Sequence, residues 1–118
     1  MTQDAVWRND GWVHFTLTVG GDDPRPVTDP TDIVEAVDQL SVDGWRFAIL
    51  GRAQEEFVQA FINDDDSTFT IEYRDGSGAQ HFRATEPVRR AKVVEVFRSY
   101  FAADDRWRTE LDWAQVSV

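Results

Sequence analysis

The 118-residue chain contains no cysteine, a single lysine and only two histidines. Without cysteine it can form no disulfide, thiolate nucleophile or zinc–cysteine site, so the fold must depend on its hydrophobic core alone. No window approaches the roughly 18 apolar residues that a membrane-spanning helix needs. Residues 1–12 also lack the basic and apolar regions of an export signal. We therefore expect a cytoplasmic protein that is neither exported nor anchored in a membrane.

Positive charge is also scarce, with 12 Lys and Arg against 22 Asp and Glu and a formal net charge of -10. Such a field repels nucleic-acid phosphates and anionic membrane surfaces, and this disfavours both as partners. The same field speeds association with a basic protein, although acidic charge also simply keeps proteins soluble. A content of 42% hydrophobic residues is typical of a globular chain, and the length favours one domain spanning residues 1–118.

Several segments carry the apolar spacing of strands. Residues 12–19 alternate with period two, and residues 45–51 place Trp45, Phe47 and Ile49 on one face. Residues 55–63 are apolar on both faces, as in a central strand. Residues 67–74 alternate again and lead through a turn with Gly76 and Gly78, which tolerate positive φ, to a strand at 79–84. We expect these last three strands to form an antiparallel meander and a final strand to span about 112–116.

Two segments carry the spacing of amphipathic helices. In the first, at about 31–40, Asp29 is the expected cap, Pro30 fits the first position and Asp32 is a weaker capping-box partner. The second spans 85–105, with Thr85 as cap, its apolar stripe in the core and Ser99 on the opposite side, and a short helical turn follows around Trp107. The order of elements predicts an α+β fold, a mostly antiparallel sheet of five to six strands with two helices packed on one face.

Three consecutive aspartates, Asp64 to Asp66, precede the strand at 67–74. An EF-hand loop begun at Asp64 would need glycine sixth and glutamate twelfth, where this chain has Phe69 and Asp75. A hairpin loop explains the segment without a metal, because Asn and Asp bond their own backbone and tolerate left-handed φ. A partner-contacting acidic loop and an ion site stay open. We expect Asp64→Lys with Asp65→Lys to leave stability nearly unchanged while weakening a basic partner.

Groups that could carry catalysis are sparse. His14 and His81 each stand alone on a strand, without metal-ligand spacing. Ser77 and Asp75 lie near His81, but no nucleophile elbow surrounds the serine, and no phosphate-binding glycine motif is present. The sequence thus predicts no catalytic residue, cofactor or metal. An alternative hypothesis is a small-ligand-binding or enzymatic domain with a pocket between sheet and helices. The polar groups to test in such a pocket are His14, His81, Glu72 and Arg74.

Five tryptophans are many for this length, and four of them lie near the chain ends: Trp7, Trp12, Trp107 and Trp113. One account is that they tie the ends to the sheet by packing. The other is that some stay exposed as interface anchors, since tryptophan is enriched among binding hot spots. The candidate partner-binding residues are therefore Asp64, Asp65, Asp66, Trp107 and Trp113.

The run from Phe57 to Trp113 resembles a set of small uncharacterised actinobacterial proteins. The shared features are a Val-Gln strand, a Glu-Tyr-Arg-Asp-Gly hairpin, a following His-Phe, a Val-Val helix and a C-terminal Asp-x-x-Trp with a second Trp. In size, charge, element order and aromatic content the chain is also similar to immunity proteins of bacterial polymorphic toxin systems. Neither resemblance implies a catalytic residue. We interpret the chain as a non-enzymatic protein-binding domain, an immunity protein neutralising a basic toxin domain, with homodimer formation as a further possibility.

Overall fold

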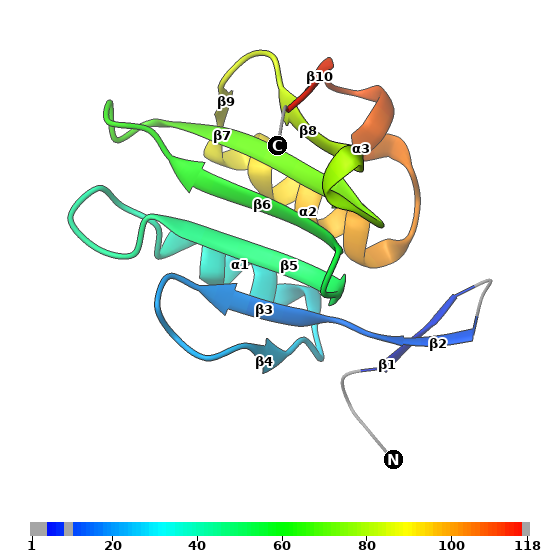
Figure 1. The fold of residues 1–118 in the computed structure, drawn as a ribbon. Coiled ribbons are helices and arrows are strands. Elements are labelled where there is room, and N and C mark those ends of the chain that lie inside the picture. The colour runs from blue at the N-terminus through cyan, green and yellow to red at the C-terminus, as the bar shows by residue number, and fades with distance from the viewer. Residues whose placement is uncertain (1–4, 9–10, 117–118) are drawn as a thin grey trace.

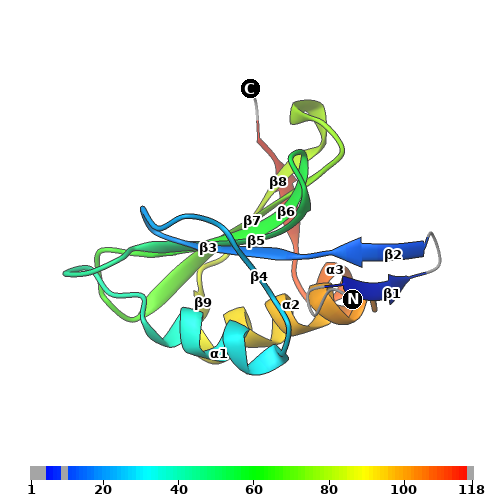
Figure 2. The ribbon, with the colours of Figure 1, turned by 90° about the horizontal axis from the view of Figure 1, so that it is seen from below.

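The computed structural model describes residues 5–8 and 11–116, with side chains from Phe15 to Val116. Its main part has two layers (Figures 1 and 2): an antiparallel sheet of eight strands, and two long helices that lie together on one face of it. The helices are α1 (Pro30–Asp38), α2 (Arg90–Ala102) and the short α3 (Arg106–Thr109). The strands of this sheet are β3 (Thr16–Val19), β4 (Arg25–Pro26), β5 (Phe47–Ala53), β6 (Glu56–Ile62), β7 (Thr68–Asp75), β8 (His81–Ala84), β9 (Val88–Arg89) and β10 (Trp113–Gln115).

The strand order is β10-β8-β7-β6-β5-β3-β4, with β9 pairing beside β8 on β7. The predicted α+β class, the central position of β6 and the antiparallel meander β6-β7-β8 are confirmed. The sheet has more strands than expected because β4 and β9 are ladders of only two residues. Two residues are too few to show an alternating pattern, so these strands could not be predicted from the sequence.

The predicted first strand at 12–19 is divided in the structure. Its first half, β2 (Gly11–His14), pairs with β1 (Ala5–Arg8) in a separate two-stranded ribbon, while its second half is β3 of the main sheet. Phe15 stands between them, fully buried, with its ring 5.9 Å from Tyr100 and 5.1 Å from Phe101. The period-two pattern of residues 12–19 continues without a break although the pairing partner changes from β1 to β5. The sequence therefore predicted one strand in place of two.

The start of α1 agrees with its sequence signals. Asp29 is the N-cap, and its side chain accepts a hydrogen bond of 2.8 Å from the Thr31 amide, with Pro30 at the first position. Asp32 reaches back to accept from the Thr28 amide at 3.2 Å. The buried face of this helix consists of Ile33, Ala36 and Val37.

The second helix starts five residues later than its predicted cap. The Thr85 amide donates to the Asp112 carbonyl at 2.9 Å, and Val88 and Arg89 pair with β7, so the chain is extended until α2 begins at Arg90. Cross-strand hydrogen bonds thus override the local cap and proline signals. Ser99, expected on the solvent side, is buried, and its hydroxyl donates to the Asp104 carboxylate where the chain turns from α2 to α3.

The first residue of α2 also closes the end of α1. The guanidinium of Arg90 donates to the carbonyls of Val37 and Leu40, the second at 3.1 Å, and lies 4.9 Å from the centre of the Phe69 ring. The last turn of α1 contains no basic residue of its own. Two carbonyls at the end of α1 and just beyond it therefore accept hydrogen bonds from the other long helix.

The turn between β7 and β8 differs in one detail from expectation. Gly76 has φ +106, the left-handed region that favours glycine, whereas Gly78 begins a short 3-10 helix, η1 (Gly78–Gln80).

No helix formed by the described residues is long and apolar enough to cross a membrane.

Candidate functional site

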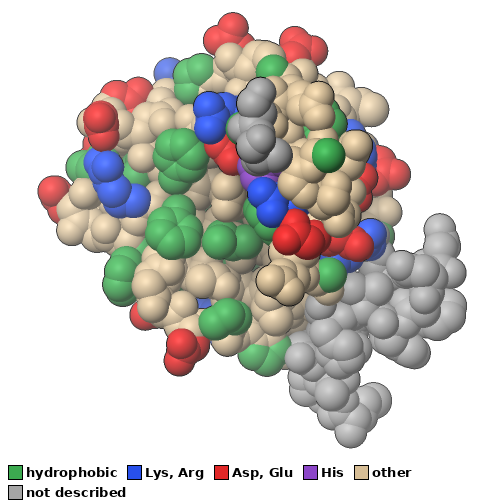
Figure 3. All heavy atoms as spheres, in the orientation of Figure 1, with side chains coloured by type: hydrophobic (Ala, Val, Ile, Leu, Met, Phe, Trp, Pro, Cys, Tyr) green, Lys and Arg blue, Asp and Glu red, His purple; other side chains and the backbone are tan. Residues whose placement is uncertain are grey.

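The face of the sheet opposite α1 and α2 is not covered by a helix, and its side chains follow from the register. One row across it runs through Thr18, Ile49, Gln59, Glu72 and Arg83. A neighbouring row pairs Phe47 with Phe61 and Phe61 with Thr70, and a third pairs Phe57 with Arg74 and Arg74 with His81. Figure 3 looks onto this face and shows hydrophobic side chains over β5 and β6, with acidic ones around their margin. The open face thus has an apolar end and a polar end.

The apolar end holds Trp45, Phe47, Ile49 and Phe61, which we call the apolar patch. Trp45 is 45% exposed and Phe47 39% exposed, and they are the large hydrophobic side chains that stand out most into solvent in the described part of the chain. Ile49 and Phe61 are half-buried beside them. Isolated exposed apolar residues are ordinary, but a contiguous group on one face marks a binding surface.

The indole of Trp45 packs against a pair of glycines, Gly20 and Gly21. A Cβ at Gly20 would stand 2.2 Å from the nearest ring carbon of Trp45, and one at Gly21 would stand 3.2 Å from it. Gly20 also has φ +56, which suits glycine. The two glycines therefore contact the aromatic ring of a residue that remains exposed.

Three loops meet at this end of the sheet, as Figure 1 shows: residues 20–24, 41–46 and 63–67. The Gly20 amide donates to the Phe47 carbonyl at 2.9 Å, and the Ile62 amide to the Arg46 carbonyl at 2.8 Å, so the loops begin side by side. Within these loops Arg46 is the single basic residue. Their six aspartates form what we call the acidic rim: Asp22, Asp23, Asp43, Asp64, Asp65 and Asp66.

The aspartate triplet is largely occupied by the fold itself. Asp65 accepts from the amides of Ser67 and Thr68 at 3.0 and 2.9 Å, and these hydrogen bonds lower the pKa of its carboxyl. Asp66 has φ +59, as expected for a hairpin loop, and accepts from the Val42 amide at 3.2 Å. Asp64 is highly exposed and pairs with Arg46 at 3.1 Å. No three His, Asp or Glu side chains among the described residues are grouped to hold a metal ion.

The other half of the acidic rim is free. Asp22, Asp23 and Asp43 are exposed, and none of them forms an ion pair with any residue that the structure describes. The sequence drew attention to the triplet because it is a run, whereas the carboxylates that remain available to a partner lie mainly in the other two loops. Only the pairing of β3 with β5 could reveal this, because the two loops are about twenty residues apart in the chain.

The polar end of the open face is a closed hydrogen-bonded network around Glu72. Its carboxylate accepts from His81 Nε2 at 2.7 Å, Arg83 Nε at 2.7 Å and Gln59 Nε2 at 3.1 Å. Burial raises the pKa of Glu72, but the hydrogen bonds and the Arg83 charge outweigh it and hold the pKa below its usual value. Glu72 is therefore ionised at neutral pH although it is only 6% exposed.

The tautomer of His81 follows from its neighbours. Arg74 Nε, which always carries a proton, donates to His81 Nδ1 at 3.0 Å, so Nδ1 is an acceptor and the ring proton sits on Nε2, facing Glu72. Arg74 is itself held by Glu55 at 2.7 Å. Both ring nitrogens are engaged and the side chain is 6% exposed, so His81 has no free nitrogen for a substrate or a metal.

The other catalytic alternatives do not assemble. Asp75 pairs with Arg108 at 3.0 Å, not with His81, so the residue types of a hydrolase triad are not brought together. The hypothesis of a ligand-binding or enzymatic pocket needs Glu72, Arg74 and His81 to lie together. They do lie together, but on the open face of the sheet and not between sheet and helices. The side chain of His14 lies outside the described residues.

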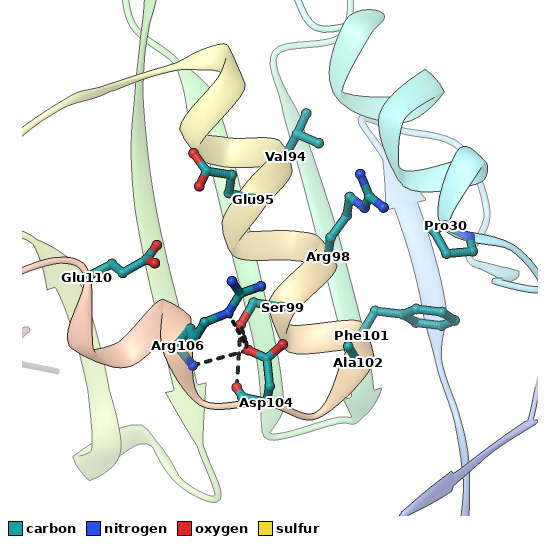
Figure 4. A pocket seen from close by; sticks show the side chains of 10 residues that line it. All are labelled: Pro30, Val94, Glu95, Arg98, Ser99, Phe101, Ala102, Asp104, Arg106 and Glu110. Atoms are coloured by element: carbon teal, nitrogen blue, oxygen red, sulfur yellow. Dashed lines mark hydrogen bonds and ion pairs between the residues drawn. The ribbon is translucent and has the colours of Figure 1, made fainter.

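A hollow of about 390 Å³ lies on the solvent side of α2, between α1 and α3 (Figure 4). Phe101 and Val94 form its apolar side, and charged groups of both signs surround it, Arg106 being paired with Asp104. Ser99 is its only hydroxyl, and that group is tied to Asp104 and to the Trp107 amide. The hollow contains no activated nucleophile.

The two candidate tryptophans pack within the domain. Trp107 is 3% exposed, with its ring 4.8 Å from Tyr73, 5.6 Å from Tyr100 and 5.8 Å from Trp113. Trp113 is half-buried, and its Nε1 donates to the Arg108 carbonyl at 3.1 Å. The prediction of an exposed anchor is therefore wrong for Trp107, whose ring joins the chain end to the core. Among the tryptophans whose side chains the structure describes, the one that is exposed is Trp45.

The loop contacts change the expected response to charge reversal in the triplet. Asp64→Lys removes one exposed ion pair and should leave the urea midpoint of unfolding nearly unchanged. Asp65→Lys removes three hydrogen-bond acceptor contacts that hold the hairpin loop, so it should lower that midpoint clearly. Urea titrations of the two single variants would test this, and equal midpoints would mean that Asp65 does not organise the loop.

No family model, curated protein or solved structure matches this chain. The fold and the site alone define its class: an α+β protein with helices on one face of an antiparallel sheet and an exposed apolar patch with an acidic rim on the other.

Proposed function

We propose that this protein is a non-enzymatic binding domain that docks a basic protein through its open sheet face. The observation that carries this proposal is the exposure of Trp45 and Phe47 together on a face that no helix covers. Protein interfaces combine aromatic anchors with a polar rim, and here the acidic rim borders the apolar patch at the end of the sheet where the three loops meet. The groups that looked suited to catalysis are engaged with one another instead.

The charge of the chain defines the partner. A net charge of -10 and a rim with six aspartates against one arginine favour a partner with a strongly positive contact surface. A second copy of this chain would bring two acidic rims together, so charge opposes a homodimer through this face. An immunity protein that neutralises a basic toxin domain in the cytoplasm fits these requirements and is the function we propose.

A charge placed within the apolar patch should abolish this binding. Phe47→Glu puts a carboxylate at the centre of the contact, and we expect the affinity to fall more than tenfold, since burying an unpaired charge costs several kcal/mol. Ala91→Glu is the matched control, because it adds the same charge at an exposed position of α2. The measurement is co-purification with the product of the gene adjacent to its own, followed by calorimetry on the purified pair.

The outcomes separate the alternatives. Loss of binding with Phe47→Glu but not with Ala91→Glu supports the open face. Equal binding of both variants would place the interface elsewhere. Failure to find any protein partner in repeated trials would contradict the proposal. A metabolite that raises the melting temperature of both variants alike would favour the ligand-binding alternative, with the hollow beside α2 as its site.

A further inference from the structure

The aromatic ring that the two glycines support suggests what the partner presents to it. The Trp45 indole packs directly on Gly20 and Gly21, where even a methyl group would collide with it at Gly20. The residue as a whole is still 45% exposed. An indole that packs on backbone and remains partly in water can serve as a platform for a planar or cationic group, since its faces carry partial negative charge.

The protein itself uses this contact repeatedly. The guanidinium of Arg108 lies 4.9 Å from the centre of the Trp107 ring, and that of Arg74 lies 5.6 Å from the centre of Phe57. Within the described part of the chain, no cation lies over Trp45. The nearest basic residue in sequence, Arg46, is turned to Asp64. The platform is thus formed but carries no cation of its own.

Asp22 and Asp43, which are exposed and form no ion pair within the described part of the chain, lie in the loops that carry the two glycines and Trp45. Asp22 follows Gly21 directly, in the turn where its amide donates to the Val19 carbonyl at 3.1 Å. Asp43 lies in the turn that the Ser41 amide closes on the Trp45 carbonyl at 3.0 Å. A guanidinium stacked on the ring has donors around its edge, in its own plane, so it can reach carboxylates beside the ring at the same time. An ammonium group is a point charge and lacks this combination.

We propose that the exposed side of the Trp45 indole receives an arginine side chain of the protein partner, with Asp22, Asp23 and Asp43 as the carboxylates around it. This inference rests on the proposed function and makes it more specific, because it names the anchor that the partner supplies. It also assigns the recognition to the loops at 20–24 and 41–46, and not to the triplet.

Short peptides test the site without knowledge of the partner. Three blocked pentapeptides, Gly-X-Gly-X-Gly with X as arginine, lysine or citrulline, are titrated into the ¹⁵N-labelled protein. The readout is the indole N–H resonance of Trp45, assigned by its loss in Trp45→Leu. We expect the arginine peptide to shift it saturably and to bind about two- to fivefold more tightly than the lysine peptide, because a guanidinium can stack on the ring and reach the carboxylates at the same time. The citrulline peptide, which is planar but neutral, should not bind measurably.

Variants locate the effect. Trp45→Leu should remove the preference for arginine over lysine, whereas Phe47→Leu, which also exchanges an exposed ring for leucine, should keep it. Gly20→Ala retains the tryptophan but places a methyl group where the ring lies, so it should remove the preference as well. Equal binding of the arginine and citrulline peptides, or an unchanged preference in Trp45→Leu, would overturn the inference.

The two proposals fail in different ways. If a protein partner no longer binds Phe47→Glu but binds Trp45→Leu normally, the open face is supported as the interface. The same result contradicts the arginine anchor. If arginine peptides bind at Trp45 but no protein partner is found, the arginine site is supported and the proposed function is contradicted.

Discussion

Replacing Trp107 by alanine is expected to lower the free energy of unfolding by about 3–5 kcal/mol, the usual range for deleting a large aromatic side chain from a core. Trp107 is 3% exposed and its ring contacts Tyr73, Tyr100 and Trp113, which come from β7, α2 and β10. The substitution leaves a cavity that three separate elements would have to close. Domains of this size have only about 5–15 kcal/mol in total, so the variant would be close to unfolding.

Urea unfolding followed by far-ultraviolet circular dichroism measures this loss without relying on tryptophan emission. Trp45→Ala is the matched control, because it deletes the same side chain from the surface, and its loss should be about 1 kcal/mol or less. Similar losses in the two variants would contradict the division between a core tryptophan and an exposed one.

Glu72→Ala is the second substitution with a large expected effect, about 2–3 kcal/mol, which is the cost of leaving buried hydrogen-bonding groups without a partner. It removes the shared acceptor of His81, Arg83 and Gln59. His81 suffers most, because its Nε2 proton is then buried with no acceptor. Glu56→Ala, which breaks the more exposed pair with Arg52, should cost less than about 1 kcal/mol.

The pH dependence of Glu72→Gln gives an independent measure of the same network. Because the folded state lowers the pKa of Glu72, the ionised carboxylate stabilises the fold fully above its unfolded pKa of about 4.3. This contribution is lost as the pH falls through the lower folded pKa. The stability difference between the wild type and Glu72→Gln should therefore be constant above about pH 5 and shrink below about pH 4.3. A difference that does not change with pH would mean that the charge of Glu72 is unimportant.

The sequence was sufficient for the class of the fold but not for the ends of its elements. Period-two and helical spacing are set by burial on one face, so they revealed the meander and both long helices. The predicted start of α2 was wrong because Val88 pairs with Phe69 and Arg89 with Thr68, 19 and 21 residues earlier, and no local signal records that pairing. Ser99 was misplaced because its burial depends on the turn to Asp104.

The site was harder to predict than the fold. The pattern placed Trp45, Phe47 and Ile49 on one face, but it could not tell that this face is uncovered, since that depends on both helices packing on the opposite side. Likewise the run of three aspartates is conspicuous in the chain, whereas Asp22 and Asp43 become neighbours only through the pairing of β3 with β5. Contacts between distant segments decided both points.

The hydrogen bonds from Arg90 to the end of α1 also have a consequence for synthesis on the ribosome. The carbonyls of Val37 and Leu40 leave the ribosome about fifty residues before the guanidinium that donates to both of them. Within the N-terminal half, the Val37 carbonyl already accepts from the Leu40 amide at 3.2 Å. We therefore expect local hydrogen bonds to form this helix end first, and Arg90 to join it to the second helix only late in synthesis.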